Sequence, residues 1–592
     1  MRRLILLITV LFSLLSMTSL AQRIQAREET LANGMRLLLL ERHSSPTVAC
    51  GWIARVGSVN ERPGITGISH LFEHMMFKGT KTIGVKEYEK ALEVQKEQDA
   101  VRAQMEEEYT VLREKLRKGE ISGNIYDPEN MTPRLSELRG QLEELFKKEK
   151  EYLIPNEIDE LYTREGALAM NAGTYYDWTL YYIGSLPANK LELWFWLESD
   201  RLLNPVFREF YSERDVVREE RRQRVESTPT GKLNELFDAT FWQSVPYSWP
   251  VIGWPSDVES ITRTQAEEYF GTYYAPNNIT AVLVGDFDSD EVLALANQYF
   301  GRIPKGTTVV PKMITTEMKQ VGEKRLSGEA ETNPTIRIRY HVPAFNHRDT
   351  FPLQILADAL DGRTGRLYKA LVEEKDLVVG EPYAQMMDLK HAGYFEVGAE
   401  IKEGREPAEV EAALVEEIER LREEPLEDLE LQKVKNQEMA DSFRRLLSNF
   451  FLLQQLLIYD ANEHWNYINT MPTMLQAVTV ADVQEVAEKY LVKENRNVGT
   501  YLRKSGSEPE DPELANLPPQ AKAMVEQQLA EIEKATDPAK LNQGLQQMLQ
   551  MQGQVPPEMK PAIDYLIQKV QERIEKLSND SASSQSDGSG VQ

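Results

Sequence analysis

The sequence is poor in the residue types that cross-link a chain or carry it through a membrane. Cysteine occurs once, at Cys50, so no disulfide can form within the chain. Beyond the N-terminal run, no apolar stretch approaches the roughly 20 residues of a membrane-spanning helix. Acidic residues outnumber basic ones, and the formal charge of −26 disfavours nucleic acid and anionic lipid as partners, while it tolerates basic peptides. The length of 592 residues predicts several domains.

The one long apolar run stands at the start of the chain. Arg2 and Arg3 precede it, and small residues at Ser19 and Ala21 follow, which predicts a secretory signal peptide over residues 1–21. Its removal would leave a charge of −28, because the two arginines leave with it. We therefore expect an exported protein, periplasmic if the source is a Gram-negative bacterium and otherwise secreted.

Histidine is also rare, with seven in the chain, yet two of them flank an acidic residue at close spacing. His70, Glu73 and His74 form the pattern H-x-x-E-H, and residues three and four apart share one face of a helix. Two neutral imidazoles suit Zn²⁺, and a carboxylate beside them can take a proton from a water whose pKa zinc has lowered to about 7. The pattern predicts one zinc ion held by both histidines with Glu73 as the base. The competing interpretation is an ordinary amphipathic helix with two inward histidines.

A catalytic zinc usually takes three protein ligands, so a third ligand must come from elsewhere in the chain. The segment 212–224 predicts a helix on which Glu213 and Glu220 lie seven residues apart on one face, whereas Glu219 points elsewhere. Taken alone, this segment is better explained as a solvated helix of mixed charge. The residues by themselves therefore leave the third ligand open.

Four motifs in a fixed order make the sequence resemble the pitrilysin or insulinase-type (M16) zinc metallopeptidases, the inverzincins. They are H-x-x-E-H, NAGTYYDWTLYY (171–182), LELWFWLESDRL (191–202) and ERDVVREERR (213–222). The resemblance spans roughly residues 24–505 and is to bacterial half-length members, in particular their zinc-bearing subunit. It implies that Glu220 is the third zinc ligand, that Glu213 supports the site from outside the ligand shell, and that Glu73 is the general base.

The resemblance also implies where a substrate lies. Family members bind a peptide along the edge strand that begins the second motif, which implies that Asn171, Ala172 and Thr174 face the substrate. Pairing through the backbone recognises an extended chain rather than a sequence, so the expected substrates are unfolded or flexible peptides. The expected activity is that of an exported zinc metalloendopeptidase.

The whole chain predicts an α+β fold of two similar domains, each a mixed or antiparallel sheet with helices on one face. Residues 261–287 and 478–504 repeat one plan: a threonine N-cap, a helix ending at a tyrosine, a polar turn and a buried strand. The repeat indicates an N-terminal metallopeptidase domain over residues 24–304 and a C-terminal M16-like domain without a metal site over residues 318–505. Residues 305–317 then form the linker.

A long helical hairpin is expected to interrupt the first domain at about residues 83–164. Both of its halves carry apolar residues at three-to-four spacing among charges. The insertion accounts for the 146 residues between His74 and Glu220, about twice the spacing in compact family members. An antiparallel pair brings its own ends together, so the site can still assemble. The hairpin is either a rigid decoration or a docking arm or gate.

The end of the chain departs from the family. Residues 506–577 predict a helical extension, and the polar residues 578–592 predict a disordered tail.

The second domain lacks more than the metal motif. In active family members an arginine and, seven residues later, a tyrosine hold the substrate over the zinc of the opposite half, and the aligned positions here are Val372 and Val379. A valine side chain donates no hydrogen bond. The resemblance therefore implies a heterodimer with a second M16-type chain that carries the Arg/Tyr pair, or otherwise a homodimer. The alternative function is a catalytically silent structural or peptide-holding subunit of a hetero-oligomer.

Overall fold

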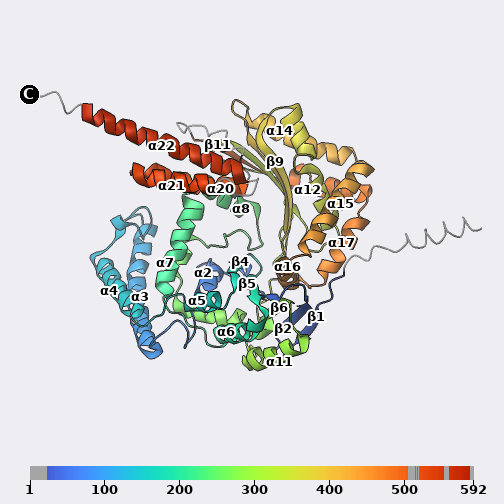
Figure 1. Cartoon of the computed structure of the whole chain (residues 1–592). Helices are drawn as coiled ribbons and strands as arrows, with labels where there is room; N and C mark the ends of the chain where they lie inside the picture. Colours follow the sequence, from blue (N-terminus) through green and yellow to red (C-terminus); the bar gives the residue numbers. More distant parts are fainter. Residues whose placement is uncertain are drawn as a thin grey trace, which may run out of the picture.

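Two β-sheets, each backed by helices, organise the chain in the computed structural model, which describes residues 23–504, 514, 517, 519–535, 537–551 and 559–586 (Figure 1). The strands of the first sheet are β1 (Arg27–Thr30), β2 (Arg36–Glu41), β3 (Thr47–Ala54), β4 (Leu168–Thr174), β5 (Thr179–Pro187) and β6 (Ile279–Gly285). The strands of the second are β7 (Lys324–Ala330), β8 (Thr335–Val342), β9 (Val378–Asp388), β10 (Gly393–Ile401) and β11 (Arg496–Arg503).

The two sheets share one topology. Their orders are β1-β2-β6-β3-β5-β4 and β7-β11-β8-β10-β9. In both sheets a single parallel pair, β2 with β6 and β7 with β11, stands next to antiparallel pairs. Apart from β1, the second sheet therefore repeats the first strand for strand, which confirms the predicted fold of two similar α+β halves.

The sequence repeat marks equivalent elements of the two halves. Helices α10 (Arg263–Tyr273) and α18 (Val480–Tyr490) both begin with a capping box, in which Thr262 and Thr479 accept a hydrogen bond from the third helical residue. After each helix an asparagine donates its amide, at 2.8 Å, to the carbonyl of the last tyrosine. These local hydrogen bonds lead each helix into an interior strand of its sheet, β6 or β11.

Helices pack on both faces of the first sheet. The remaining helices of the first half are α2 (Ile68–Met75), α6 (Leu191–Leu203), α7 (Phe210–Arg221), α8 (Gly231–Phe241), α9 (Pro255–Ser260) and α11 (Ser289–Tyr299). Alternate residues of β2 point to opposite sides, with Leu37 and Leu39 in one core and Leu38 and Leu40 in another. Burial on both faces explains why this strand is an uninterrupted apolar run.

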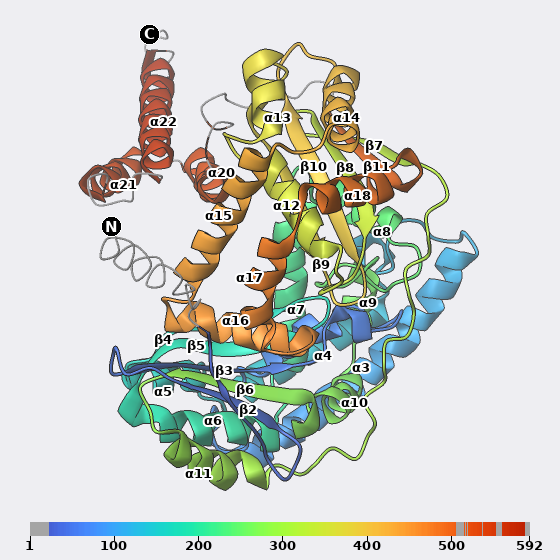
Figure 2. The same cartoon turned by 90° about the vertical axis from the view of Figure 1, so that its right-hand side faces the viewer.

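The second half supplies the helix that covers the face of the first sheet turned toward it. Its helices are α12 (Thr350–Leu360), α13 (Arg366–Tyr368), α14 (Pro407–Glu423), α15 (Asp428–Arg445), α16 (Asn449–Asn462) and α17 (Tyr467–Ala477). Buried leucines of α16, among them Leu453 and Leu456, pack on Leu38, Ile53 and Val282 of the first sheet (Figure 2). The expectation of helices on one face is thus incomplete, because a helix from the other half covers the second face.

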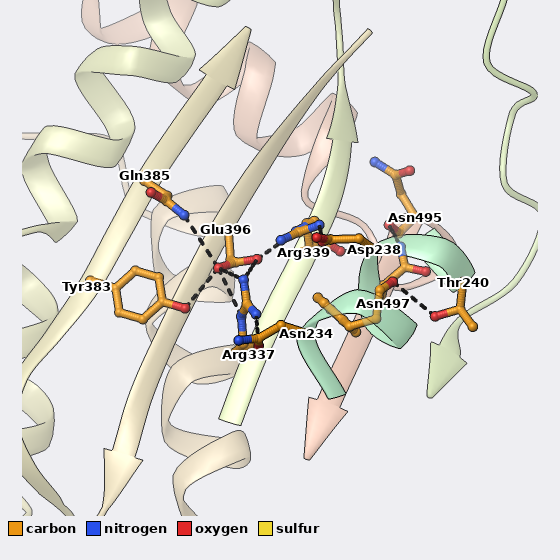
Figure 3. A network of polar contacts seen from close by, with 11 residues as sticks. Asn234, Asp238, Thr240, Arg337, Arg339, Tyr383, Gln385, Glu396, Asn495 and Asn497 are labelled. Atoms are coloured by element: carbon orange, nitrogen blue, oxygen red, sulfur yellow. Dashed lines mark hydrogen bonds and ion pairs between the residues drawn. The ribbon is translucent and has the colours of Figure 1, made fainter. Parts of the chain in front are cut away.

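In exchange, the first half contributes helix α8, which packs on the second sheet. Strand β8 alternates between apolar residues in the core of the second half and the arginines Arg337 and Arg339, which face α8. Figure 3 shows both guanidinium groups around Glu396, with Arg339 Nε 2.6 Å and Arg337 Nη2 2.9 Å from its carboxylate oxygens. From α8, Asp238 accepts a hydrogen bond from Arg339 at 2.6 Å and Asn234 accepts one from Arg337 at 2.6 Å. A buried charge network therefore fixes α8 on the second sheet.

The insertion is a helical hairpin as predicted. It consists of α3 (Tyr88–Arg117) and α4 (Pro133–Lys150), which lie side by side around a small apolar core of their own, followed by α5 (Glu157–Arg164) (Figure 1). A bridge between Val85 and Leu153 closes its base. The ends of the insertion are thereby held together, so that the segments on either side remain neighbours.

The C-terminal extension is also helical, with α20 (Pro519–Lys534), α21 (Pro538–Met551) and α22 (Lys560–Ser586) around a separate core. The expected disordered tail differs from the structure, because α22 continues from residue 578 to Ser586. Adding a residue to an existing helix needs no new nucleus, so a polar segment can extend it. Residues 587–592 lie outside the described residues.

The predicted signal peptide, 1–21, also lies outside the described residues, as does most of the segment 505–518. The stretch 305–317 contains no helix or strand, and the domain limits drawn from the sequence stay a prediction. None of the helices in the described part of the chain combines the length and apolar character that crossing a membrane requires.

The Glu396 network generates a stability prediction. Glu396→Gln removes the one anion between two buried guanidinium groups, which should lower the free energy of unfolding by about 3–5 kcal/mol. Urea unfolding followed by circular dichroism measures the change. The matched control is Glu411→Gln, since its partner Arg325 is 52% exposed, and it should cost less than about 1 kcal/mol. Equal effects of the two substitutions would contradict the assignment.

Candidate metal centre

Helix α2 is oriented by the turn before it. Gly67 has φ of 90°, and a Cβ there would lie 2.6 Å from the carbonyl oxygen of Ile252, so only glycine fits. The carboxylate of Glu61 accepts hydrogen bonds from the backbone N–H groups of Gly67 and Ser69, both at 2.8 Å, at the positive end of the helix. The short helix that follows therefore leaves the turn in a defined direction, toward α7.

The structure brings the three predicted ligands together. His74 Nε2 lies 3.4 Å from Glu220 Oε2, and His70 Nε2 lies 3.7 Å from Glu220 Oε1. One ligand atom from each residue lies within 4.8 Å of the others. Among the described residues, no other group of histidine, cysteine and acidic side chains is arranged in this way.

This donor set fits a zinc ion. Tetrahedral coordination with bonds of 2.0–2.1 Å places neighbouring ligand atoms about 3.3–3.4 Å apart. The His74 to Glu220 separation already has this value, and the His70 to Glu220 separation of 3.7 Å exceeds it by a few tenths. Two imidazoles and one carboxylate also leave a fourth position for water. That these three residues are zinc ligands remains a prediction, and the geometry is compatible with it.

Residues around the ligands orient and neutralise them. Glu213 Oε1 lies 2.9 Å from His74 Nδ1, which directs the other ring nitrogen, Nε2, at the metal position. Lys78 Nζ lies 2.5 Å from Glu213 Oε2. On the exposed side, Arg224 Nη1 lies 2.7 Å from Glu220 Oε1. Glu213 thus stands where a supporting residue is expected, outside the ligand group.

The surroundings separate the pKa values of the two histidines in the protein without metal. Burial, and then the neighbouring His74, lower the pKa of His70 to about 4. Burial also disfavours the charge on His74, but hydrogen bonds and negative charge from Glu213 and Glu220 outweigh it and raise the pKa of His74 to about 9. At neutral pH, His74 therefore carries a proton that a metal ion must displace.

Glu73 lies beside the ligands without joining them. Its Oε2 accepts a hydrogen bond of 2.6 Å from the hydroxyl of Thr174. Burial is the largest influence on this carboxyl and raises the pKa of Glu73. A carboxylate that is held by one oxygen and whose proton affinity is raised is suited to accept and return a proton.

The predicted substrate residues lie on β4, which is the edge strand of its sheet. Asn171 is exposed, while Ala172, Gly173 and Thr174 are half-buried. The backbone of this strand pairs only with β5 within the described sheet. Thr174 differs from Asn171 and Ala172, because its hydroxyl donates a hydrogen bond to Glu73. Contact of these residues with a substrate stays a prediction.

Sequence reasoning missed three contacts of the site: Thr174 with Glu73, Lys78 with Glu213, and Arg224 with Glu220. Lys78 and Arg224 each follow a predicted ligand by four residues, a spacing that brings helical side chains onto one face and so offered a signal. No local pattern connects Thr174 to Glu73, which precedes it by about a hundred residues. That contact depends on the way the sheet meets α2.

The second half contains a cavity but no comparable ligand set in the described residues. A cavity of about 580 Å³ lies beside the loop Asp361–Arg366 and α15 and has no histidine in its lining. His341 instead stacks on Phe241 with ring centroids 3.9 Å apart. Val372 packs against the core of the second half. Both side chains therefore have packing roles.

Both halves of the chain are similar to known proteins. A family model described as insulinase (peptidase family M16) matches residues 36–124, and one described as peptidase M16 inactive domain matches residues 260–438. The zinc protease PqqE of Helicobacter pylori is 28% identical over 381 residues, covering 63% of this chain and 85% of the relative. Two separate parts of the chain thus match models of the M16 peptidase family.

Solved structures agree with this M16 assignment in their fold. A protease from Helicobacter pylori has a TM-score of 0.66 at 22% identity, over 81% of this chain and 100% of that chain. A peptidase M16 inactive domain from Pseudomonas fluorescens has a TM-score of 0.62 at 15% identity, over 82% of this chain and 100% of that chain. The insulinase match contains α2 with its histidines, and the inactive-domain match covers much of the second half.

The pKa values predict how zinc binding depends on pH. Because His74 is protonated up to about pH 9 in the protein without metal, zinc binding at pH 7 should release about one proton. The apparent affinity should then rise about tenfold per pH unit from pH 7 toward pH 9. Calorimetric titration of chelator-treated protein in buffers of different ionisation enthalpy counts the protons.

The control for this titration is Glu213→Gln, which removes one of the groups that raise the pKa of His74. It should release less than the full proton at pH 7, and its zinc affinity should fall roughly 10- to 100-fold. Zinc binding without proton release by the unaltered chain at pH 7 would contradict the assignment of His74.

Proposed function

We propose that this M16 chain is an exported zinc-dependent endopeptidase that hydrolyses unfolded or flexible peptides. The proposal rests on one observation above all, the meeting of Glu220 with His70 and His74 while Glu73 stands beside them. A zinc ion held by these three ligands would supply Lewis acidity and a water of lowered pKa. Export rests on the signal peptide predicted over residues 1–21.

Glu73 is the residue that moves protons in this proposal. Its Oε2 is held by Thr174, and we assign Oε1 to accept a proton from the attacking water and to pass it to the leaving amine. The pKa of Glu73 is raised toward neutral pH, and a group with a pKa near the working pH can both accept a proton and give it back. Thr174 orients the base and is a positioning residue.

The substrate binds as an additional strand on β4. Backbone groups of Asn171 and Ala172 are at the open edge of the sheet, and the strand ends at Thr174, beside the base. An extended peptide that pairs with this edge would therefore run past Glu73 and the metal position. Main-chain pairing requires a flexible segment and excludes a folded one.

The chain lacks part of the machinery that the family resemblance implies. Val372 and Val379 stand where a donor pair is expected, and neither side chain can hydrogen-bond a developing oxyanion. We therefore propose a second M16-type chain with an arginine and a tyrosine at these positions as the partner. A silent peptide-holding subunit is the second candidate function, favoured by the same two valines. The complete ligand set with Glu73 favours the enzyme, because holding a peptide requires neither.

Substitution of the base and of a ligand separates the two functions. Glu73→Gln should keep one zinc per chain and lower turnover roughly 10²- to 10⁴-fold, because only the proton acceptor is lost. His70→Ala should lose both zinc and turnover. Metal analysis and a quenched-fluorescence peptide assay measure the two effects. Glu219→Gln is the control, since Glu219 is 49% exposed on α7 and pairs with Arg222. Unchanged turnover in Glu73→Gln would rule out the proposed base.

The partner is tested by mixing chains. The purified chain alone should hydrolyse peptides poorly, and adding an M16-type chain that carries the Arg/Tyr pair should raise turnover roughly 10²- to 10³-fold. A partner whose arginine and tyrosine are replaced by valine is the matched control and should have no such effect. Full turnover by the lone chain would contradict the heterodimer.

A further inference from the structure

A cavity of about 370 Å³ opens directly beside the candidate metal centre. Its lining includes Glu73 and His74 on one side and Asn171 of the edge strand on another. Residues 154–158, at the base of the insertion, form another part of the lining. The insertion therefore takes part in the surface that faces a peptide on β4.

This wall is attached firmly to the site. Beyond the bridge that closes the insertion, the backbone N–H of Ile154 donates to the carbonyl of Gly84 at 3.1 Å, and Gly84 N–H donates in turn to Glu157 Oε2. Buried Glu149, at the end of α4, accepts a hydrogen bond of 3.2 Å from the backbone of Glu209, which begins α7. The cavity is thus enclosed by elements whose relative positions are fixed.

The lining combines apolar walls with an excess of negative charge. Phe77, Ile154 and Ile158 supply apolar surface. The carboxylates are those of Glu73, Glu157, Glu209 and Glu213, against one lining ammonium, that of Lys78. Lys78 Nζ lies 2.5 Å from Glu213 and 3.7 Å from Glu209, so its charge is directed mainly to Glu213. The buried guanidinium of Arg208, which is outside the lining, also interacts with Glu157 and Glu209. The four lining carboxylates still outnumber Lys78 and Arg208, so negative charge is in excess.

We propose that this cavity is a subsite for a basic side chain, arginine or lysine, of a peptide bound along β4. A long aliphatic stem would lie against the apolar wall, while its charged end would meet Glu157 and Glu209. The inference rests on the proposed function for the peptide as ligand. It gives the insertion a role in substrate selection, since residues 154–158 lie within the segment 83–164 that the sequence assigns to the insertion.

Peptide binding to a protein that cannot turn over provides the test. The full chain with Glu73→Gln, loaded with zinc, is titrated with fluorescent peptides of one flexible scaffold in which a single arginine, lysine, citrulline or norleucine is moved through each position. Fluorescence anisotropy gives the Kd. At one position arginine or lysine should bind about tenfold more tightly than citrulline or norleucine, as expected for a charge-assisted hydrogen bond.

Neutral variants identify the groups responsible. Glu209→Gln alone should reduce the preference severalfold, and adding Glu157→Gln should abolish it. At position 157, glutamine still has an oxygen that can accept the hydrogen bond from Gly84 N–H. If the double variant fails to fold, the single variant Glu209→Gln still tests the subsite. Glu160→Gln is the matched control, because Glu160 is an exposed residue of α5 outside the cavity lining, and it should keep the full preference.

The outcomes separate the subsite from the proposed activity. Equal binding of arginine and citrulline at every position, or a preference that survives the double variant, would overturn the subsite. Turnover of the best-binding peptide by the unaltered chain, with and without the proposed partner, is measured separately. A preserved preference without turnover would reject the peptidase and leave the subsite, whereas turnover without preference would reject the subsite alone.

Discussion

In the proposed zinc site, the carboxylate of Glu220 has to stay within a few ångströms of two imidazoles although it follows His74 by 146 residues. Metal-ligand distances vary by only about 0.2 Å between working sites, so α7 must be fixed relative to α2 with comparable accuracy. A single helix anchored only by its own apolar face would be free to slide or rotate. Much of the first half is arranged so that this helix is held at both of its ends.

Different parts of the chain hold the two ends. At the start of α7, Tyr211 donates its hydroxyl to Asp99 of the insertion at 2.8 Å, and Glu149 of the insertion caps the backbone of Glu209. At the other end, Arg221 donates two hydrogen bonds, of 2.7 and 2.8 Å, to Glu235 of α8. The insertion therefore braces the helix that carries Glu220.

The sequence predicted features whose cause is local. Periodic leucines indicated the hairpin, the threonines at 262 and 479 indicated the helix starts, and H-x-x-E-H indicated a face with two imidazoles, because in each case the spacing along the chain sets the spacing in space. The contact of Thr174 with Glu73 and the exchange of α8 and α16 had no such signal. They depend on which surfaces meet after folding. Arg337 and Arg339 alternate with apolar residues along β8, and this pattern indicates a polar partner on that face of the strand. The pattern does not indicate which helix supplies the partner.

The exchange of α8 and α16 connects the second half, which has no predicted ligand, to the candidate metal centre. The leucines of α16 complete the core of the first sheet, and the second sheet anchors α8 through Arg339 and Glu396. Helix α8 in turn holds Arg221, the neighbour of Glu220. A substitution in the second half can therefore displace Glu220 without touching it. The second half has no H-x-x-E-H pattern and so no metal chemistry of its own is expected there, whereas loss of its sheet would release α8 and with it the end of α7 that carries Glu220.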